Sequence, residues 1–484
     1  MDGNRIKKSV LTGLFWKFME RGGTHGVQFI VQIVLARILL PKDFGLISVI
    51  LIFITFSNAL VQSGLNTALI QKKEVDNKDY SSVFYISLLL SVFLYIFLFI
   101  ISPYIAVFLE SDQISSLIRV LALTLFIGAF NSIQVAIVTR KMEFKRLFYS
   151  SLYGIVISGA VGIVLAYLNF GIWALVYQQI LNQLIIVITL WITGGWRPTL
   201  EFSILRVKQL FSFGWKILMS SLIFNLTKDV RTFVIGKLFS LDILGYYNRG
   251  AQFPGLITTN INGSIQSVMF PAFAAQQEDR IVLKSMVRRS IVTSSFIVFP
   301  LMTGLAVIAE PLVRILLTDK WLPSVPFIWI FCSIYALEPL HTANQQSINA
   351  VGRSDITLKL NIVKRIIDFL ILGVTIPFGI YSIAYGMILS GIIGSIINAY
   401  PNKSILNYGY LEQVKDIMPS LFLSIIMGGV VFFIRYLNLI PSVTLIVQII
   451  LGVITYCSLA RVLRNESYVY ITASLKEIYN SRFT

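Results

Sequence analysis

Long apolar runs alternate with short polar connectors along almost the whole chain. Runs of roughly 20 residues, the length of a helix that crosses the hydrocarbon core of a bilayer, can be placed fourteen times. They cover residues 13–38, 44–65, 82–109, 116–138, 149–168, 171–193, 210–236, 246–270, 287–309, 325–350, 357–378, 380–400, 417–436 and 441–461. A transmembrane β-barrel would instead show alternating strands of about ten residues. The pattern predicts an all-α polytopic membrane protein with about 14 transmembrane helices.

Basic residues are distributed unequally between the two sets of connectors. With the N-terminus inside, twenty-five lysines and arginines fall in cytoplasmic segments, and six fall in the opposite loops. Lysine and arginine collect on the cytoplasmic side of membrane proteins, so we expect both termini in the cytoplasm. The same rule explains most of the net charge of +17 without nucleic acid as a partner. The stretch MDGNRIKKS leads straight into a segment longer than the apolar part of a signal peptide, so we expect no cleavable signal.

Composition agrees with a membrane protein and gives no sign of an enzyme. Of 484 residues, 56% are hydrophobic and 13% are charged, which is more apolar surface than a soluble domain of this size can bury. The two cysteines, Cys332 and Cys457, both lie in apolar runs, so no disulfide framework is expected. HExxH, CxxC, GxxxxGK[ST] and G-x-S-x-G motifs are absent from the sequence. We therefore expect no catalytic residue, no metal site and no resident cofactor.

A weak internal repeat appears at a spacing near 200 residues. LFWKF at 14–18 resembles FGWKI at 213–217, and VLARILLPKDFGLIS at 34–48 resembles VIGKLFSLDILGYYN at 234–248. The repeat predicts two pseudo-symmetric six-helix lobes around a central site, as in many transporters. We expect an N-terminal lobe over 1–200, a C-terminal lobe over 201–405, and two extra transmembrane helices with a cytoplasmic tail over 406–484.

The PKDFG connector within the first copy of this repeat has its own structural interpretation. Pro41 ends the first helix, Asp43 can cap the next one, and Gly45 permits close packing. We expect this connector to be structural and not a contact to substrate.

Nine basic residues lie within predicted spans, where sidedness does not explain them. They are Lys17, Arg21, Arg119, Lys216, Lys228, Arg231, Arg249, Lys364 and Arg365. An ionisable side chain in hydrocarbon costs on the order of 3 kcal/mol. In the first span, polar residues also recur every three or four positions and so share one helical face. Several such faces favour a water-filled cavity.

Structural explanations remain open for the same residues. Lys17 and Arg21 lie in the first turns of their span and can extend to the membrane surface. Lys228, Asp229 and Arg231 can neutralise one another. Lys364 and Arg365 can lie at shallow depth, and His341 in the tenth span can be a packing residue.

A cavity rich in cations and amides suits a ligand that carries phosphate and sugar hydroxyls. Our candidate substrate-binding residues are Arg21, His25, Gln28, Lys228, Arg231, Arg249, Lys364 and Arg365. Acidic residues within the spans could balance the charge or bind a coupling proton or sodium ion. These candidates are Glu20, Asp229, Glu338 and Asp368.

Four stretches resemble the Wzx-type polysaccharide flippases, and in particular the branch that exports teichuronic or colanic acid repeat units. They are LARILLPKDFGLISV (35–49), SGLNTALIQKK (63–73), LGYYNRGAQFPG (244–255) and VMFPAFAAQQED (268–279). The resemblance covers nearly the whole chain and places it in the superfamily of multidrug extruders and lipid II flippases. Arg21 and Arg249 match cationic cavity residues of related flippases, while Lys228 and Arg231 match by place only.

This resemblance implies a transporter that works by alternating access in the bacterial cytoplasmic membrane. It would move undecaprenyl-pyrophosphate-linked oligosaccharide to the outer leaflet, for lipopolysaccharide, capsule or exopolysaccharide synthesis. Membrane lipid is an implied partner, and the polysaccharide polymerase machinery is a further one.

The sequence leaves two other functions open. An ion-coupled multidrug or small-molecule antiporter of the same fold would favour acidic sites for cationic drugs, whereas cations predominate within these spans. A membrane glycosyltransferase or repeat-unit polymerase would need catalytic outer loops, and the predicted outer loops are short and carry few charges.

Overall fold

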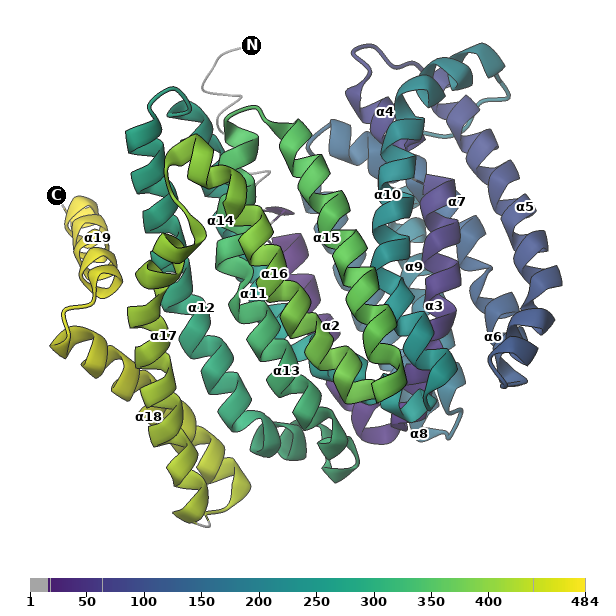
Figure 1. Cartoon of the computed structure of the whole chain (residues 1–484). Coiled ribbons are helices and arrows are strands. Elements are labelled where there is room, and N and C mark those ends of the chain that lie inside the picture. The colour runs from purple at the N-terminus through teal and green to yellow at the C-terminus, as the bar shows by residue number, and fades with distance from the viewer. Residues whose placement is uncertain (1–15, 18, 63, 438, 484) are drawn as a thin grey trace. The chain divides into compact units, whose positions relative to one another are not determined.

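The computed structural model describes residues 16, 17, 19–62, 64–437 and 439–483 (Figure 1). Throughout these residues every regular element is a helix. The first elements are the π-helix η1 (Met19–Gly23) and α2 (Thr24–Ile38), α3 (Pro41–Gln62), α4 (Leu65–Gln71), α5 (Asn77–Phe108), α6 (Gln113–Leu121), α7 (Thr124–Arg140), α8 (Phe144–Tyr167), α9 (Ile172–Thr193) and α10 (Ile204–Leu238). They are followed by α11 (Leu241–Ala275), α12 (Arg280–Leu317), η2 (Asp319–Ser324), α13 (Val325–Ala336), α14 (Glu338–Ala350), α15 (Ser354–Thr375), η3 (Ile376–Phe378), α16 (Ile380–Leu406), α17 (Tyr410–Phe433), η4 (Ile434–Leu437), α18 (Pro441–Val462) and α19 (Glu466–Phe483).

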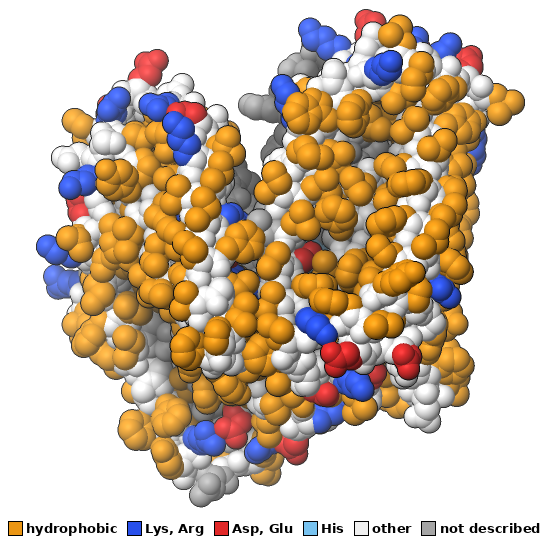
Figure 2. Space-filling view, turned by 45° about the vertical axis from the view of Figure 1, so that its right-hand side comes forward, with side chains coloured by type: hydrophobic (Ala, Val, Ile, Leu, Met, Phe, Trp, Pro, Cys, Tyr) orange, Lys and Arg blue, Asp and Glu red, His pale blue; other side chains and the backbone are white. Residues whose placement is uncertain are grey.

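Helices occur at all fourteen places where the apolar pattern predicts them. In the described part of the chain, ten helical stretches are long and apolar enough to cross a membrane. The chain is therefore a multi-pass helical membrane protein. The other four predicted spans correspond to α2, which is apolar but only 15 residues long, and to α10, α11 and α15. The count of fourteen crossings stays a prediction. In Figure 2, hydrophobic side chains cover most of the visible face, and charged side chains are fewer and scattered, many of them near the top and the bottom of the view.

The chain divides into two compact units, residues 1–245 and 246–484. Helix α10 packs against α3, α4 and α5 and belongs to the first unit. The predicted lobe boundaries at 200 and 405 stay a prediction.

Both units contain the same series of elements, which supports the weak repeat in the sequence. Each has a long helix (α5 and α12), then a helix broken in two (α6–α7 and α13–α14), then an antiparallel pair (α8–α9 and α15–α16). The pairs α5 with α7 and α7 with α9 pack in the first unit as α12 with α14 and α14 with α16 pack in the second. Left-handed backbone recurs 210 residues apart, at Met142 and Gly352 and again at Asn169 and Gly379.

Two repeat-related glycines mark a close approach of backbones. A Cβ atom added to Gly45 would lie 1.8 Å from the carbonyl oxygen of Leu241, and one added to Gly245 would lie 2.1 Å from that of Pro41. The contact is reciprocal, because each repeat copy places its glycine against the first residue of the other copy's helix. Helix α2 ends at Ile38 and α3 begins at Pro41, so Pro41 is the first residue of the second helix, earlier than the predicted start at residue 44. The Asp43 carboxylate accepts a hydrogen bond from the Leu40 amide at 3.0 Å, in agreement with its predicted capping role.

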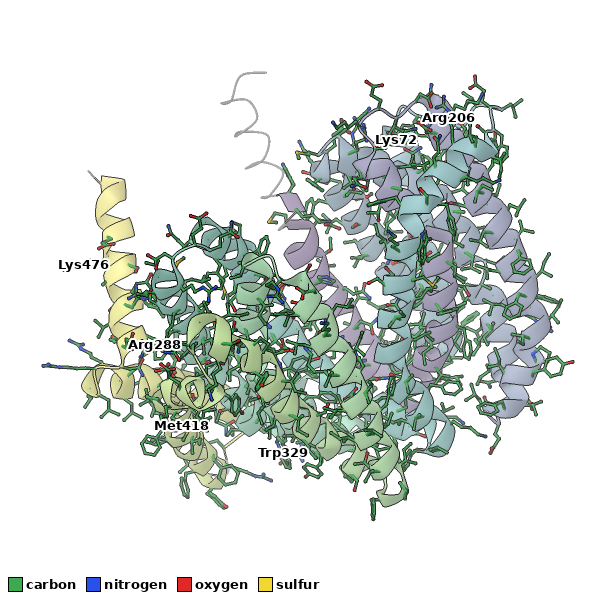
Figure 3. All side chains as sticks on the ribbon, turned by 45° about the horizontal axis from the view of Figure 1, so that its top comes forward. Lys72, Arg206, Arg288, Trp329, Met418 and Lys476 are labelled. Atoms are coloured by element: carbon green, nitrogen blue, oxygen red, sulfur yellow. The ribbon has the colours of Figure 1, made fainter. Side chains whose placement is uncertain are left out.

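The connector between α9 and α10 is fixed by ion pairs and hydroxyl groups at the start of α5. Asp79, only 1% exposed, pairs with Lys72 at 2.7 Å and with Arg206 at 3.3 Å, and both cations are labelled in Figure 3. The Thr199 amide donates to the Ser81 hydroxyl at 3.0 Å. These contacts hold the start of α10 against the start of α5.

Arg140, at the end of α7, donates hydrogen bonds to carbonyl groups at the C-terminal end of α4. These carbonyl groups have no hydrogen-bond partner within their own helix. Its guanidinium donates to the carbonyl oxygens of Leu69 at 3.0 Å and Ile70 at 3.3 Å, and also to those of Lys72 and Lys73. The last carbonyls of a helix need such donors. The sequence placed Arg140 among the cytoplasmic cations, and the structure adds this capping role.

We expect Arg140→Ala to lower the free energy of unfolding by about 2 kcal/mol, the usual loss for hydrogen bonds to a charged group. Chemical or thermal unfolding of the purified protein in detergent measures this change. The control is Arg146→Ala, which removes only a partly exposed ion pair with Glu143 at 3.0 Å and should change stability little. Equal stability of the two variants would contradict the capping role.

Helices α17 and α18 pack on α12 in the second unit. Their core contains Phe296, Leu423, Met427 and Tyr456, and the Tyr456 hydroxyl donates to the Phe296 carbonyl at 2.8 Å. Helix α19, drawn in yellow in Figure 1, contacts α12 and α18. Arg288 of α12 donates two hydrogen bonds of 2.9 Å to the Glu466 carboxylate at the start of α19.

Lowering the pH should weaken the packing of α19 on α12. The hydrogen bond from Arg288 lowers the pKa of Glu466 from its usual value. A carboxyl whose pKa is lowered in the folded state stabilises that state above the pKa of the unfolded chain, about 4.3 for glutamate. This stabilisation is lost as the pH falls through the lower folded value. We expect Glu466→Gln to raise amide exchange of α19 at neutral pH, whereas Glu477→Gln, at an exposed acid of the same helix, should not.

Candidate functional site

A polar cluster on α11, α14, α15 and α16 of the second unit contains several predicted site residues. Helix α14 begins with Glu338 and Pro339, directly after the apolar helix α13 ends at Ala336. A carboxylate in the first turn of a helix is favourable because it faces the positive end of the helix dipole. The Glu338 carboxylate is half-buried and accepts a hydrogen bond of 3.2 Å from the Asn262 amide of α11.

His341 lies one turn further along α14 and uses both ring nitrogens. Nδ1 is 3.0 Å from the side-chain nitrogen of Asn398 on α16, and the ring also forms a hydrogen bond to the backbone of Gly391. When the Asn398 amide donates to Nδ1, the proton lies on Nε2 and is donated to the Gly391 carbonyl. This arrangement fits a neutral imidazole that joins α14 to α16.

Lys364 of α15 lies near both acid and imidazole. It is close enough to Glu338 and to His341 to interact with each electrostatically. A Cβ on Gly394 of α16 would meet the His341 ring at 3.3 Å and the Lys364 chain at 3.6 Å. Glycine at 394 therefore leaves room for the lysine and the imidazole on one side of α16.

Asp368 lies one turn after Lys364 on the same helix. Its carboxylate accepts a hydrogen bond of 2.6 Å from the Ser390 hydroxyl of α16. Together with half-buried Arg365, the cluster offers two cations, two carboxylates, an imidazole and two amides. Such a set can bind an anionic group through its cations and hydroxyl groups through its amides.

Arg249 lies elsewhere in the second unit, near the start of α11. It is 3% exposed, its guanidinium carbon is 5.0 Å from the ring centre of Trp321, and it donates to the Gln252 side chain. Trp321 is fully buried in η2. Protein groups thus hold Arg249 in a stacked position, and its role in substrate binding stays a prediction.

The first helical segment places its polar residues in varied surroundings. Lys17 pairs with Glu20 at 2.6 Å and also lies over the Phe144 ring at 5.5 Å. His25 is exposed, while Gln28 is half-buried and has a buried side-chain oxygen with no hydrogen-bond partner among the described residues. The turn from Met19 to Gly23 is a π-helix, a form often found at functional sites.

The remaining predicted site residues belong to the first unit. Asp229 and Arg231 are half-buried on α10, a helix of the first unit. The side chains of Arg21 and Lys228 lie outside the described residues. The substrate and coupling roles of all these residues stay predictions.

Sequence reasoning missed Asn262, Asn398 and Ser390, which hydrogen-bond to the predicted residues. The available signal was a polar side chain within an apolar run. A polar side chain in an apolar run does not by itself indicate which distant helix it hydrogen-bonds to.

No group of three histidine, cysteine, aspartate or glutamate side chains that could hold a metal ion occurs within the described residues. Cys332 is buried and Cys457 is exposed, and both are free thiols.

Comparison with known proteins adds a family and a fold. A family model described as polysaccharide biosynthesis protein matches residues 34–326. The succinoglycan biosynthesis transport protein ExoT of Rhizobium meliloti is 25% identical over 319 residues, which are 66% of this chain and 65% of ExoT. This chain thus covers slightly less than two thirds of that relative. The teichuronic acid biosynthesis protein TuaB of Bacillus subtilis is 23% identical over 460 residues, or 93% of this chain and 95% of TuaB.

Among solved structures, the lipid II flippase MurJ in an inward closed conformation has the same fold. The TM-score is 0.73 at 14% identity, and the match covers 94% of this chain and 98% of MurJ. The shared fold extends along almost the entire length of both chains.

Proposed function

Because the chain belongs to the polysaccharide biosynthesis protein family, we propose that it is a flippase for lipid-linked oligosaccharides. It moves undecaprenyl-pyrophosphate-linked repeat units from the cytoplasmic to the outer leaflet of a bacterial cytoplasmic membrane, with both of its termini in the cytoplasm. Flipping forms and breaks no covalent bond, so the protein acts as a transporter and not as an enzyme. ExoT is a succinoglycan biosynthesis transport protein, TuaB a teichuronic acid biosynthesis protein and MurJ a lipid II flippase, and each supports this substrate class.

The observation that carries the proposal is the concentration of polar side chains on three helices, α10, α11 and α15. Ten other predicted spans are apolar enough to cross a membrane and α2 is a shorter apolar helix, so these polar faces are a costly exception. Lysine and arginine suit a pyrophosphate, and asparagine and glutamine suit sugar hydroxyls. The prenyl tail needs no polar site, because it can stay in the lipid while the headgroup passes by alternating access through a cationic cavity.

Ion coupling belongs to the same proposal. The Glu338 carboxylate lies 3.2 Å from Asn262 and near Lys364. It can bind a proton or a sodium ion when Lys364 binds substrate. Asp368 is a second candidate. Glu20 is paired with Lys17 at 2.6 Å, which makes it a weaker candidate than either.

Reconstituted vesicles test the proposal. A fluorescent undecaprenyl-pyrophosphate oligosaccharide is placed in both leaflets, and a membrane-impermeant quencher reports how fast it exchanges between them. We expect wild-type protein to accelerate exchange, and Arg21→Ala and Arg249→Ala to slow it. Lys359→Ala, at an exposed position of α15, should behave as wild type.

Complementation gives the cellular counterpart. In a strain that lacks its own flippase, wild-type protein should restore surface polysaccharide at matched membrane expression. Efflux of a cationic dye from vesicles without exchange of the lipid-linked oligosaccharide would overturn the proposal and support the antiporter.

A further inference from the structure

Four side chains form a fully buried polar network where α14, α16 and α17 meet. Asn344, Ser347, Asn402 and Gln413 are each 0% exposed. Asn344 donates to Gln413 at 2.7 Å and Gln413 donates back to Asn344 at 2.9 Å, so the two amides form a reciprocal pair. Asn402 donates to Asn344 at 2.7 Å and to Ser347 at 2.9 Å. Such a network has one favourable geometry, because any displacement leaves a buried amide unsatisfied.

The network joins a helix outside the repeat to a helix of the candidate site. Gln413 lies in the first turns of α17, which follows the last repeat helix, α16. Asn344 lies three residues after His341 on α14, the short helix that also begins with Glu338. Because α14 is separated from α13 by a break, its position depends on its neighbours more than that of a continuous helix does.

Helix α17 is in turn anchored one turn further along the same face. Asp416, three residues after Gln413, accepts hydrogen bonds from the Tyr408 hydroxyl at 2.7 Å and from Arg288 of α12 at 3.0 Å. The Gln413 side chain also donates to the Tyr408 carbonyl at 3.2 Å. The amide that holds α14 is therefore tied to the long helix α12.

A similar contact occurs in the first unit, where a buried amide side chain also hydrogen-bonds to the segment that follows the last helix of the repeat. Gln134 of α7 lies 210 residues before Asn344 and is also buried. It donates to the Trp196 carbonyl at 3.2 Å, and a Cβ on Gly194 would lie 2.6 Å from its oxygen. In both units a buried amide in the second half of the broken helix thus holds the chain that follows the last helix of the repeat. In the second unit that chain is α17.

We propose that α17 is a positioning helix: through the Asn344–Gln413 pair it sets the place of α14, and so of Glu338 and His341, during transport. The C-terminal helices are then part of the transport machinery and not an appendage to it. The inference rests on the proposed function for its transport readout. The position of α14 can also be measured without transport.

The decisive variants replace or exchange the pair. Asn344→Leu/Gln413→Leu removes both amides of the pair together, and Asn402, which loses Asn344 as an acceptor, keeps its hydrogen bond of 2.9 Å to Ser347. Asn344→Gln/Gln413→Asn exchanges them and keeps both groups at the same total size. Gln448→Leu is the control, because Gln448 is a buried amide that donates to the α17 carbonyl of Val431 at 3.2 Å and is absent from the network around α14.

We expect the double leucine variant to lose about tenfold in exchange rate of the lipid-linked oligosaccharide, a loss equivalent to about one hydrogen bond between neutral groups. Amide exchange of α14 should rise while the melting temperature stays near that of wild type. The exchanged pair should recover most of the transport, and Gln448→Leu should transport as wild type does. Transport within twofold of wild type, with unchanged amide exchange in α14, would overturn the inference.

If the double leucine variant does not fold, Gln413→Ser serves in its place, because its smaller hydroxyl leaves room for water beside Asn344. A rise in α14 exchange with reduced transport supports the inference, and wild-type behaviour in both refutes it. Failure of wild-type protein to move lipid-linked oligosaccharide would refute the proposed function alone, since the amide exchange of α14 still reports on its positioning.

Discussion

Lys364→Ala should reduce transport of lipid-linked oligosaccharide by about 10- to 100-fold, the effect of losing one charge-assisted hydrogen bond. Lys364 is the cation that lies near both Glu338 and His341, and its ammonium can bind the pyrophosphate of the substrate. The exchange assay in vesicles measures the rate. Protein yield and melting temperature should stay close to those of wild type, because the lysine is only half-buried.

A second variant separates two roles for this lysine. If Lys364 served only to balance Glu338, then Lys364→Ala/Glu338→Gln would remove both charges and recover transport. We expect no recovery, because the pyrophosphate would still lack its cation. Lys359→Ala on the same helix is the matched control. Recovery of the double variant to the rate of Glu338→Gln alone would contradict a role in substrate binding.

Gly45→Ala and Gly245→Ala should each destabilise the protein by about 1–3 kcal/mol, the usual cost of overpacking. The added Cβ would lie 1.8 Å from the Leu241 oxygen in the first case and 2.1 Å from the Pro41 oxygen in the second. Both obstacles are backbone atoms, so relief requires movement of a helix end and not of a side chain. Melting temperature and the monodisperse fraction after purification measure the loss.

Gly429→Ala is the matched control for these variants, since no atom lies within 4 Å of its added Cβ. In a helix interior alanine is favoured over glycine by about 1 kcal/mol, so this variant should be as stable as wild type or more so. The same propensity acts at Gly45, which makes any loss there a steric effect. The losses at Gly45 and Gly245 should not add in the double variant, because the two positions share one contact. Wild-type stability of Gly45→Ala would show that the two helix ends are not in firm contact.

Helix positions were well predicted, and helix breaks were not. The predicted segment 325–350 is two helices, with Leu337 between them, and 116–138 is likewise divided between α6 and α7. Hydropathy averaged over a span cannot detect a break that keeps the residues apolar. The observed helices also extend beyond the apolar runs: α11 covers Leu241–Ala275 where 246–270 was predicted, because polar residues continue a helix outside the hydrocarbon.

Candidate site residues were selected by type and spacing, and their partners were not. Glu338, His341 and Lys364 stand out because ionisable groups are costly in a membrane. The pairing of Lys17 with Glu20 follows from a local spacing of three residues. Asn398 lies 57 residues from His341, and Asn262 lies 76 residues from Glu338, so no local period connects them.

By itself, the sequence determined that this chain is a helical membrane protein, where its helices lie, and which of them carry polar faces. Those properties depend on the cost of transferring each residue to hydrocarbon, which acts on short segments independently of the rest of the fold. The tertiary structure alone decided that Lys364 lies near Glu338 and His341 and that Gln413 of α17 hydrogen-bonds to Asn344 of α14. Such contacts depend on side-chain packing and on satisfied hydrogen bonds between distant segments, and they are settled only when the helices assemble.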